Sequence, residues 1–384
     1  MRIHSRIAFF SLLFAMVVFL VENVNLDLSV SQVFAGNGFE SQWPKTDFSH
    51  ATIDIEEIIS GGPPKDGIPA IDHPDFVAVD IAGRWLHPRE PVIVVEYKGR
   101  ARAYPLQILI YHEIVNDKLL DLPFSVTFCP LCNASIVFDR RFEGQVLDFG
   151  TTGNLRKSDM VMYDRQTESW WQQFTGSGIV GHYSGKTLTQ LTSKIVAFQA
   201  FQTTYSDGEV LSRDTGYSRP YGKNPYRGYD RVGDMPFLFT DPVDPRLPAM
   251  ERVISVGHDN QYRLYPFGEF RNAGLIHDQM GELAIVIFHQ DNLLSVLDKR
   301  KIADSRSVYA AVAYDRRLQG KLLDFNIGSG GIVDKQTGWT WDIFGRGIAG
   351  PLKGKQLRAV DSGVHFAFAW LAFNPDSEIY RRRN

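Results

Sequence analysis

The sequence predicts a β-rich α+β protein, internally duplicated into two similar modules of mainly antiparallel strands, each with one or two short helices. The first observation is a succession of short β-branched runs separated by Gly, Asn and Pro turns. The second is a set of motifs that occurs twice in one order, and Asp334 follows Asp164 by 170 residues. A shared order at a near-constant offset indicates duplication. The repeated motifs are Asp139-Arg140-Arg141 with Asp315-Arg316-Arg317, Leu147-Asp148-Phe149 with Leu323-Asp324-Phe325, and Asp164 to Thr167 with Asp334 to Thr337.

The length and composition are sufficient for two cores, because the chain has 384 residues and 44% of them are hydrophobic. We expect a first module at 92–211 and a second at 253–384. A Pro- and Gly-rich lead-in covers 36–91, and a Tyr-, Pro- and Gly-rich linker covers 212–252. The linker is too long for a simple connector, so we expect an ordered loop that lies over the first module.

Local patterns predict the elements of the first module. Residues 92–97 read as a strand that turns at Lys98-Gly99, and Pro105 is suited to begin a helix over 106–115. Cys129-Pro130-Leu131-Cys132 lies between two strand-like runs and is therefore predicted to be a turn. The remaining predictions are strands at 124–128 and 134–140, hairpins at 136–148 and 161–174, a short helix within 194–205, and no regular element at 61–69.

The N-terminus has the pattern of a secretory signal. Arg2 and Arg6 precede an apolar run over 7–21, and small residues follow up to Ala35. We expect a signal peptide at 1–35 and a mature chain without a transmembrane span, since the apolar run is short. The alternative is an uncleaved anchor that tethers the protein to the membrane. Either way the protein is predicted to be exported, to the periplasm or outside the cell, where thiols tend to oxidise.

The net charge of −3 gives no reason to expect nucleic acid or an anionic membrane as a partner. The Gly-containing segment 150–155, with Lys157-Ser158-Asp159, has backbone that could hold an anion. It lacks the strand-to-helix setting and the lysine of a phosphate loop, so no nucleotide cofactor is expected. The sequence indicates no partner protein.

The two cysteines of the chain, Cys129 and Cys132, both lie in the first copy. In the second copy the corresponding stretch reads 288–292, Phe-His-Gln-Asp-Asn, and Ala273-Gly274 falls opposite His112-Glu113. Residues that both copies share are those the fold needs, whereas residues that one copy lacks are candidates for chemistry. The candidate site therefore belongs to the first module.

A Cys-x-x-Cys turn between two strands resembles the knuckle of zinc ribbons, in which both sulfurs face one ion. Those sites use two knuckles and this chain has one, so a metal needs other ligands. His112 is the first candidate and Met162, with Met160 on the same strand face, is the second; His182 is a further one. Two thiolates with imidazole or thioether suit Cu(I), and with imidazole alone Zn(II), so the sequence favours copper before zinc.

Two other interpretations of the cysteines stay open. The sequence therefore does not decide whether the chain is an enzyme. The first is a thiol oxidoreductase or thiol-dependent enzyme in which Cys129 or Cys132 acts with His112 as base and Glu113 nearby. The second is an envelope ligand-binding module in which the cysteines form a structural disulfide and a glycan is held by Trp170, Tyr217 and Tyr221. For His112 and the two methionines, an ordinary place in the core is the alternative to a ligand role.

Several motifs of the first module resemble an exported prokaryotic family known only as a domain of unknown function with a Cys-Pro-Leu-Cys centre. The resemblance runs from about Gly61 to the end of the chain, and it implies an extracytoplasmic β-rich protein without implying an activity. The motifs are Tyr104-Pro105-Leu106, His112-Glu113, Asn116-Asp117, Phe128 to Cys132, Val137 to Arg140 and Val161 to Arg165, together with the segment from Gly61 to Asp72 in the lead-in.

Overall fold

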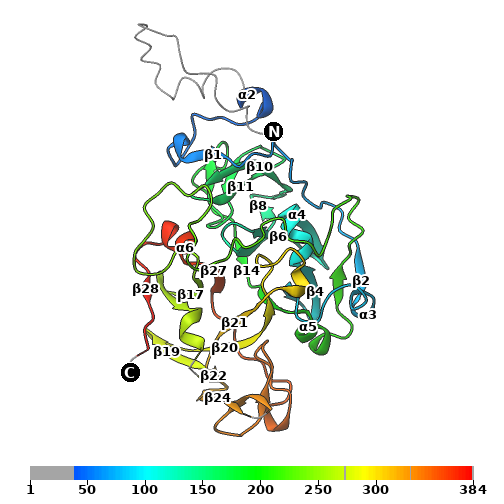
Figure 1. Ribbon diagram of the computed structural model, residues 1–384, viewed down its shortest axis with the longest axis vertical. Coiled ribbons are helices and arrows are strands. Elements are labelled where there is room, and N and C mark those ends of the chain that lie inside the picture. The colour runs from blue at the N-terminus through cyan, green and yellow to red at the C-terminus, as the bar shows by residue number, and fades with distance from the viewer. Residues whose placement is uncertain (1–38, 272–273, 329, 383–384) are drawn as a thin grey trace, which may run out of the picture. The chain divides into compact units, whose positions relative to one another are not determined.

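The computed structural model describes residues 39–271, 274–328 and 330–382, and it confirms the β-rich class with mainly antiparallel sheets and few short helices (Figure 1). Residues 43–384 form one compact unit, and the short helix α2 (Phe39–Gln42) belongs to the part of the chain before it. The predicted signal peptide, 1–35, lies outside the described residues. Within the described ranges no helix has the length and apolar character needed to cross a membrane.

The first module contains three sheets and a small hairpin, β8 (Arg141–Phe142) with β9 (Gln145–Val146). The first sheet has the order β15 (Lys194–Ala197), β3 (Pro91–Tyr97), β4 (Arg100–Pro105), β16 (Glu209–Leu211), β2 (Phe76–Ala78). The second has the order β14 (Gln190–Leu191), β7 (Ala134–Asp139), β6 (Leu122–Cys129), β5 (Ile114–Leu119). The third has the order β1 (Ile58–Ser60), β10 (Phe149–Arg156), β11 (Asp159–Asp164), β12 (Trp170–Gln172), β13 (Gly178–Val180). The helices are η1 (Ile55–Glu57), α3 (Val79–Ala82), α4 (Leu106–His112) and α5 (Phe198–Thr204).

The second module also contains three sheets and a small hairpin, β22 (Arg317–Leu318) with β23 (Lys321–Leu322). Its first sheet has the order β27 (Ser362–Phe366), β17 (Arg252–His258), β18 (Gln261–Pro266), β28 (Glu378–Ile379). The other two are β19 (Ile276–Met280), β20 (Leu283–Leu294), β21 (Ser307–Asp315) and β24 (Phe325–Gly328), β25 (Gly331–Asp334), β26 (Thr340–Trp341). The helices are η2 (Phe267–Phe270), η3 (Ile302–Asp304), η4 (Gly350–Leu352) and α6 (Ala367–Phe373).

The two modules repeat individual hydrogen bonds as well as elements. Arg102 on β4 pairs with Asp117 and with Glu209 of the parallel strand β16. Arg263 on β18 pairs in the same way with Asp278 and with Glu378 of the parallel strand β28. These matched pairs favour the predicted duplication, which stays an interpretation.

A buried carboxylate is the second matched feature. Asp164 accepts hydrogen bonds from the Thr167 amide (2.7 Å) and from Trp171 Nε1 (2.9 Å), and Asp164 is fully buried. In the second module Asp334 accepts from the Thr337 amide (2.6 Å) and from Trp341 Nε1 (2.9 Å), and it is also fully buried. Since the arrangement occurs in both modules, it serves the fold.

The local predictions hold for the strands, the turns and the short helix within 194–205, and they differ from the structure at one helix end and in the lead-in. The helix predicted over 106–115 ends at His112, because Glu113 has φ 58° and residues 114 and 115 belong to β5, which pairs with β6. The segment 194–205 starts as strand β15 before it becomes α5. The lead-in has no helix or strand over 61–69, as predicted, but it contributes β1 and β2 to two sheets.

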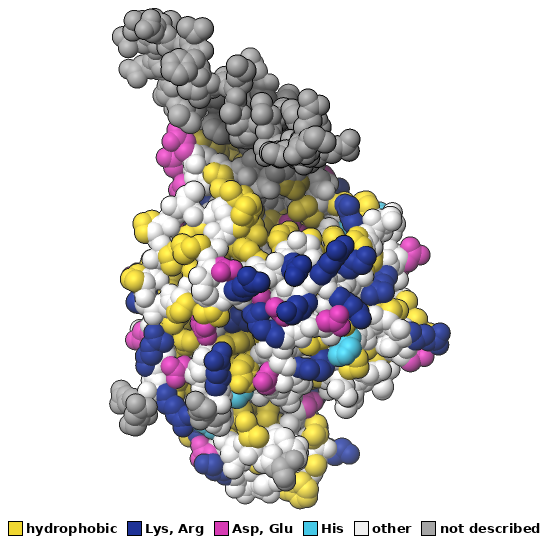
Figure 2. Space-filling model, in the orientation of Figure 1, with side chains coloured by type: hydrophobic (Ala, Val, Ile, Leu, Met, Phe, Trp, Pro, Cys, Tyr) yellow, Lys and Arg dark blue, Asp and Glu magenta, His cyan; other side chains and the backbone are white. Residues whose placement is uncertain are grey.

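The linker and the second module both contact the core of the first. The largest buried cluster includes Cys129 and Cys132 together with Met250 and with Phe366 of β27. Tyr221 and Phe237 of the linker hydrogen-bond to the first module, as described below. On the surface, Figure 2 shows Lys and Arg side chains gathered across the middle of the face it presents, so the net charge of −3 does not describe this local region.

Candidate metal centre

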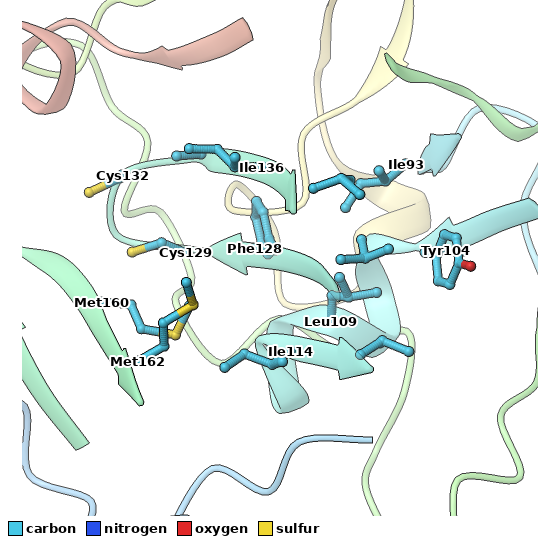
Figure 3. Close-up of a cluster of buried hydrophobic side chains, with 14 of the residues drawn as sticks. Ile93, Tyr104, Leu109, Ile114, Phe128, Cys129, Cys132, Ile136, Met160 and Met162 are labelled. Carbon is cyan, nitrogen blue, oxygen red and sulfur yellow. The ribbon is translucent and has the colours of Figure 1, made fainter. Parts of the chain in front are cut away.

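The Cys-Pro-Leu-Cys segment is the turn of the β6–β7 hairpin, as predicted. Cys129 ends β6 and pairs with Ala134 at the start of β7, and Asn133 takes a left-handed conformation with φ 49°. The turn brings both sulfurs to one end of the hairpin (Figure 3). Both cysteines are free thiols, and their exposed fractions are 1% and 0%.

A second turn, between β10 and β11, faces this one. Lys157 and Ser158 both have positive φ (53° and 62°), which is the geometry of a tight hairpin turn. The Ser158 carbonyl accepts from the thiols of Cys132 (3.5 Å) and Cys129 (4.0 Å). Asp159 follows directly, and its carboxylate lies within 4.8 Å of both sulfurs. The two turns therefore converge on three ligand atoms.

Hydrogen bonds fix one carboxylate oxygen of Asp159, whereas the other oxygen has no such donor. Oδ2 accepts from Gln172 Nε2 (2.6 Å) and from the Phe174 amide (2.9 Å). Oδ1 is buried and accepts no hydrogen bond from any described residue. Buried polar atoms are almost always hydrogen-bonded, so an oxygen with no N–H or O–H donor, beside two thiols, is suited to bind a ligand.

The centre is acidic, and the described part of the chain places no compensating cation beside it. Burial raises the pKa of Asp159 to about 6, and burial with the charge of Asp159 raises the pKa of Glu113 to about 8. Burial also raises the pKa of the Cys129 and Cys132 thiols. Among the described residues, neither carboxyl group forms an ion pair with Lys or Arg. The two thiols and Glu113 therefore hold protons at neutral pH that a metal ion can displace.

His112, the first candidate ligand from the sequence, is engaged elsewhere. Its Nδ1 donates to the Pro69 carbonyl (2.7 Å) and its Nε2 accepts from the Tyr221 hydroxyl (2.6 Å). Burial lowers the pKa of His112, which favours this neutral ring. Among the described residues, the set of His, Cys, Asp and Glu atoms that could share an ion does not include His112. The physical reason is that α4 ends there, and the ring lies under the linker.

The other candidates divide between the core and the surface. Met160 and Met162 lie on β11 in the same buried cluster as the cysteines, and Figure 3 shows both beside Cys129. Met162 therefore stays a candidate thioether ligand. His182 is exposed beside Tyr183 and is outside the group.

The residues proposed to hold a glycan are not gathered into one platform. Trp170 is fully buried and packs edge-on against Trp43, with the ring centroids 5.1 Å apart. It is therefore a core residue, which corrects the sequence interpretation. Tyr217 is 46% exposed, whereas Tyr221 is partly buried against His112.

The matching hairpin of the second module lacks the tight turn. The ladder pairs Cys129 with Ala134, five residues before Asp139, and it pairs Gln290 with Ala310, five residues before Asp315. Gln290 therefore takes the place of Cys129 in the strand pairing. This is one residue later than the comparison of the two sequence copies predicted. The strand pairing of this hairpin then continues to Leu294 with Ser307, where the first module has already turned.

The linker and the second module close the centre from water. Ser158 Oγ donates to the Phe237 carbonyl (2.5 Å), and Tyr226 and Tyr229 pack against the cysteine cluster. From the second module, the Phe366 amide donates to the Cys132 carbonyl (2.9 Å). Sequence reasoning missed Asp159 as a ligand, although its position directly after a predicted polar turn was the available signal.

A family model described as "Protein of unknown function (DUF3179)" matches residues 65–377, which is most of the chain and includes both turns of the centre. No curated protein and no solved structure matches the sequence. The comparisons thus supply a family for the domain and leave its chemistry to the geometry of the site.

Proposed function

The chain belongs to the DUF3179 family, and we propose that it binds a thiophilic metal ion between Cys129, Cys132 and Asp159. The observation that carries the proposal is the buried, unpartnered Oδ1 of Asp159 beside two buried thiols. A cation at this point would offset the free energy needed to ionise these groups away from water.

The third ligand decides which ion fits best. With His112 and Met162 together as further ligands, copper is favoured before zinc. The Asp159 carboxylate is a harder donor, and Zn²⁺ accepts thiolate and carboxylate ligands together. A divalent ion also leaves less residual charge on three anionic ligands than Cu⁺ does. We therefore place zinc first. Glu113 lies outside the three-residue group, but the charge of Asp159 raises its pKa and its own charge raises the pKa of Cys129, so we propose it as the fourth ligand, reached by a change of its side-chain rotamer.

Elemental analysis tests the proposal on full-length protein purified without affinity metals. We expect about one equivalent of zinc per chain, and its loss from a Cys129→Ser, Cys132→Ser double variant. His112→Phe is the matched control, since it removes a buried imidazole close to the centre and should keep the metal. Copper in place of zinc would retain the centre and change the ion. No metal, with two thiols that appear only after reduction, would refute the proposal.

The same cluster supports a second candidate function, a reversible dithiol. Cys129 and Cys132 would form a disulfide by giving two electrons and two protons to a partner disulfide, which becomes two thiols. The observation in its favour is the buried Asp159 carboxyl group, whose raised pKa suits a proton acceptor. The burial of both thiols opposes this dithiol function. Their raised pKa values leave few thiolates, and the linker over the centre hinders exchange with another protein. The thiol count before and after reduction separates the two functions.

We also propose that the protein works outside the cytoplasm, on the basis of Arg2, Arg6 and the apolar run over 7–21. We expect the mature protein in the periplasm or culture medium to begin at Gly36, which N-terminal sequencing would show. An intact Met1 in a membrane fraction would instead indicate an uncleaved anchor, and recovery from the cytoplasm would contradict export.

A further inference from the structure

A cavity of about 520 Å³ lies between the two modules. Strands β7 and β14 line it from the first module, and β17, β27 and α6 line it from the second. Its volume is within the range of about 300–1,000 Å³ that small-molecule sites occupy. None of the three ligand residues of the metal centre lines it, so it is a separate site.

His365 is the most informative residue in the wall of this cavity. It is 3% exposed, and its Nδ1 has no hydrogen-bond partner. Its ring packs against Phe174 and stacks on Trp370, with centroid distances of 4.9 Å and 5.3 Å. A buried ring nitrogen without a partner lowers stability, so its presence needs a reason.

The ladder position of His365 shows that the fold does not require histidine there. His365 on β27 pairs with Val253 on β17. In the matching sheet of the first module, Val196 on β15 pairs with Val92 on β3. An apolar residue serves the sheet in one module, and a polar residue that faces the cavity replaces it in the other.

The cavity lining selects against anionic ligands. Nine of its side chains are Ser, Thr, Asn or Gln, none is Lys or Arg, and Asp361 is the acidic one. Aromatic rings of Phe174, Tyr262 and Trp370 line the same space. Many hydroxyl and amide groups with aromatic faces, and no basic group, match a neutral ligand that has both polar edges and apolar faces.

We infer that this cavity binds a neutral carbohydrate, with a sugar hydroxyl group hydrogen-bonded to the imidazole of His365 in its wall. A hydroxyl group can donate to an imidazole nitrogen or accept from it, so it satisfies either tautomer. The sugar's C–H faces can pack on the aromatic rings while its other hydroxyl groups meet the Ser, Thr, Asn and Gln side chains. The site differs from a platform on Trp170, which is buried in the core.

The cavity wall also touches the metal centre. The amide of Phe174 donates to Asp159 Oδ2, and the residue after His365, Phe366, donates to the Cys132 carbonyl. The carbohydrate site does not depend on the proposed metal, because its lining is complete without it. The Cys129→Ser, Cys132→Ser double variant should therefore bind the same sugars, which separates failure of one proposal from failure of the other.

Isothermal titration calorimetry of the full-length protein with D-glucose, N-acetyl-D-glucosamine and maltotriose tests the inference. We expect saturable binding of at least one of these sugars, and a loss of at least about tenfold in affinity in His365→Phe. Phenylalanine keeps the ring between Phe174 and Trp370 and removes the unpartnered nitrogen, so the melting temperature should hold or rise.

His289→Phe is the matched control. His289 is also buried, its Nδ1 also lacks a partner, and its ring stacks on Phe270, but it does not line the cavity. This variant also removes the hydrogen bond between His289 Nε2 and the Gly274 carbonyl (3.3 Å), so its melting temperature should hold or fall, and it should leave sugar binding unchanged. Absence of binding for all three sugars would overturn the inference, and so would equal affinity in His365→Phe and the original protein.

Discussion

With Cys129, Cys132 and Asp159 as its protein ligands, the centre is expected to lose zinc affinity by about 100-fold for each pH unit between pH 8 and pH 6. The sign follows from the protons that must leave when the ion binds. Burial raises the pKa of both thiols, so Cys129 and Cys132 carry protons throughout this range. Asp159, with a pKa of about 6, is mostly ionised in it and contributes little. Two displaced protons change the affinity by about tenfold each per pH unit.

The change of zinc affinity with pH also tests whether the carboxyl groups of Asp159 and Glu113 bind the ion. Below pH 6 the Asp159 carboxyl group is protonated too, and the fall should steepen to about 1,000-fold per unit. Asp159→Asn should remove this extra steepening. If Glu113 is the fourth ligand, its pKa of about 8 adds a third proton between pH 6 and pH 8, and Glu113→Gln should return the slope to about 100-fold.

Competition with a chromophoric chelator at pH 5.5, 6.5 and 7.5 would measure the slope, and proton release in weak buffer would count the protons directly. The chelator's own protonation must be subtracted, and His112→Phe supplies the control for a titrating group beside the centre. A zinc affinity that is independent of pH in this range would mean that no thiol proton is displaced, and the cysteines would then not be ligands.

From the sequence we could predict the part of this centre that lies within one short segment, namely the two cysteines. Strand-like residues on both sides of Cys129 and Cys132 imply a turn, and in a tight turn the two sulfurs can meet without any tertiary contact. Asp159 comes to them through the packing of the β10–β11 turn against the β6–β7 turn. Periodicity carries no signal for such a contact between separate hairpins, so Asp159 was recognised as part of a polar turn and not as a ligand.

His112 is the reverse case, a residue that the sequence predicted as a ligand and that the structure places outside the centre. Sequence reasoning placed it within a helix that continues to residue 115, but the chain turns at Glu113 with φ 58°. The ring then meets the Pro69 carbonyl and Tyr221, from the lead-in and the linker. Neither segment has a regular pattern over those residues, so their contacts could not be predicted. The strands of both modules, by contrast, follow from β-branched runs and turn residues.

The buried carboxylate that occurs in both modules leads to a second large expected effect, on stability. We expect Asp334→Asn to lower the free energy of unfolding by about 2–4 kcal/mol. The buried carboxylate accepts from the Thr337 amide and hydroxyl group and from Trp341 Nε1. An amide NH₂ in its place would oppose one of these donors and leave a buried polar group without a partner. Urea denaturation followed by tryptophan fluorescence would measure the change, with exposed Asp291→Asn as the control.

Asp164→Asn should cause a loss of similar size, because the first module has the same three donors in Thr167 and Trp171. Both variants should keep the metal, since neither carboxylate is a ligand. Equal losses of stability with intact metal binding would mean that what the modules share maintains the fold, while Cys129, Cys132 and Asp159 serve chemistry in one of them. A loss of metal in Asp334→Asn at a temperature where the protein is folded would contradict this division, because it would make the second module part of the centre.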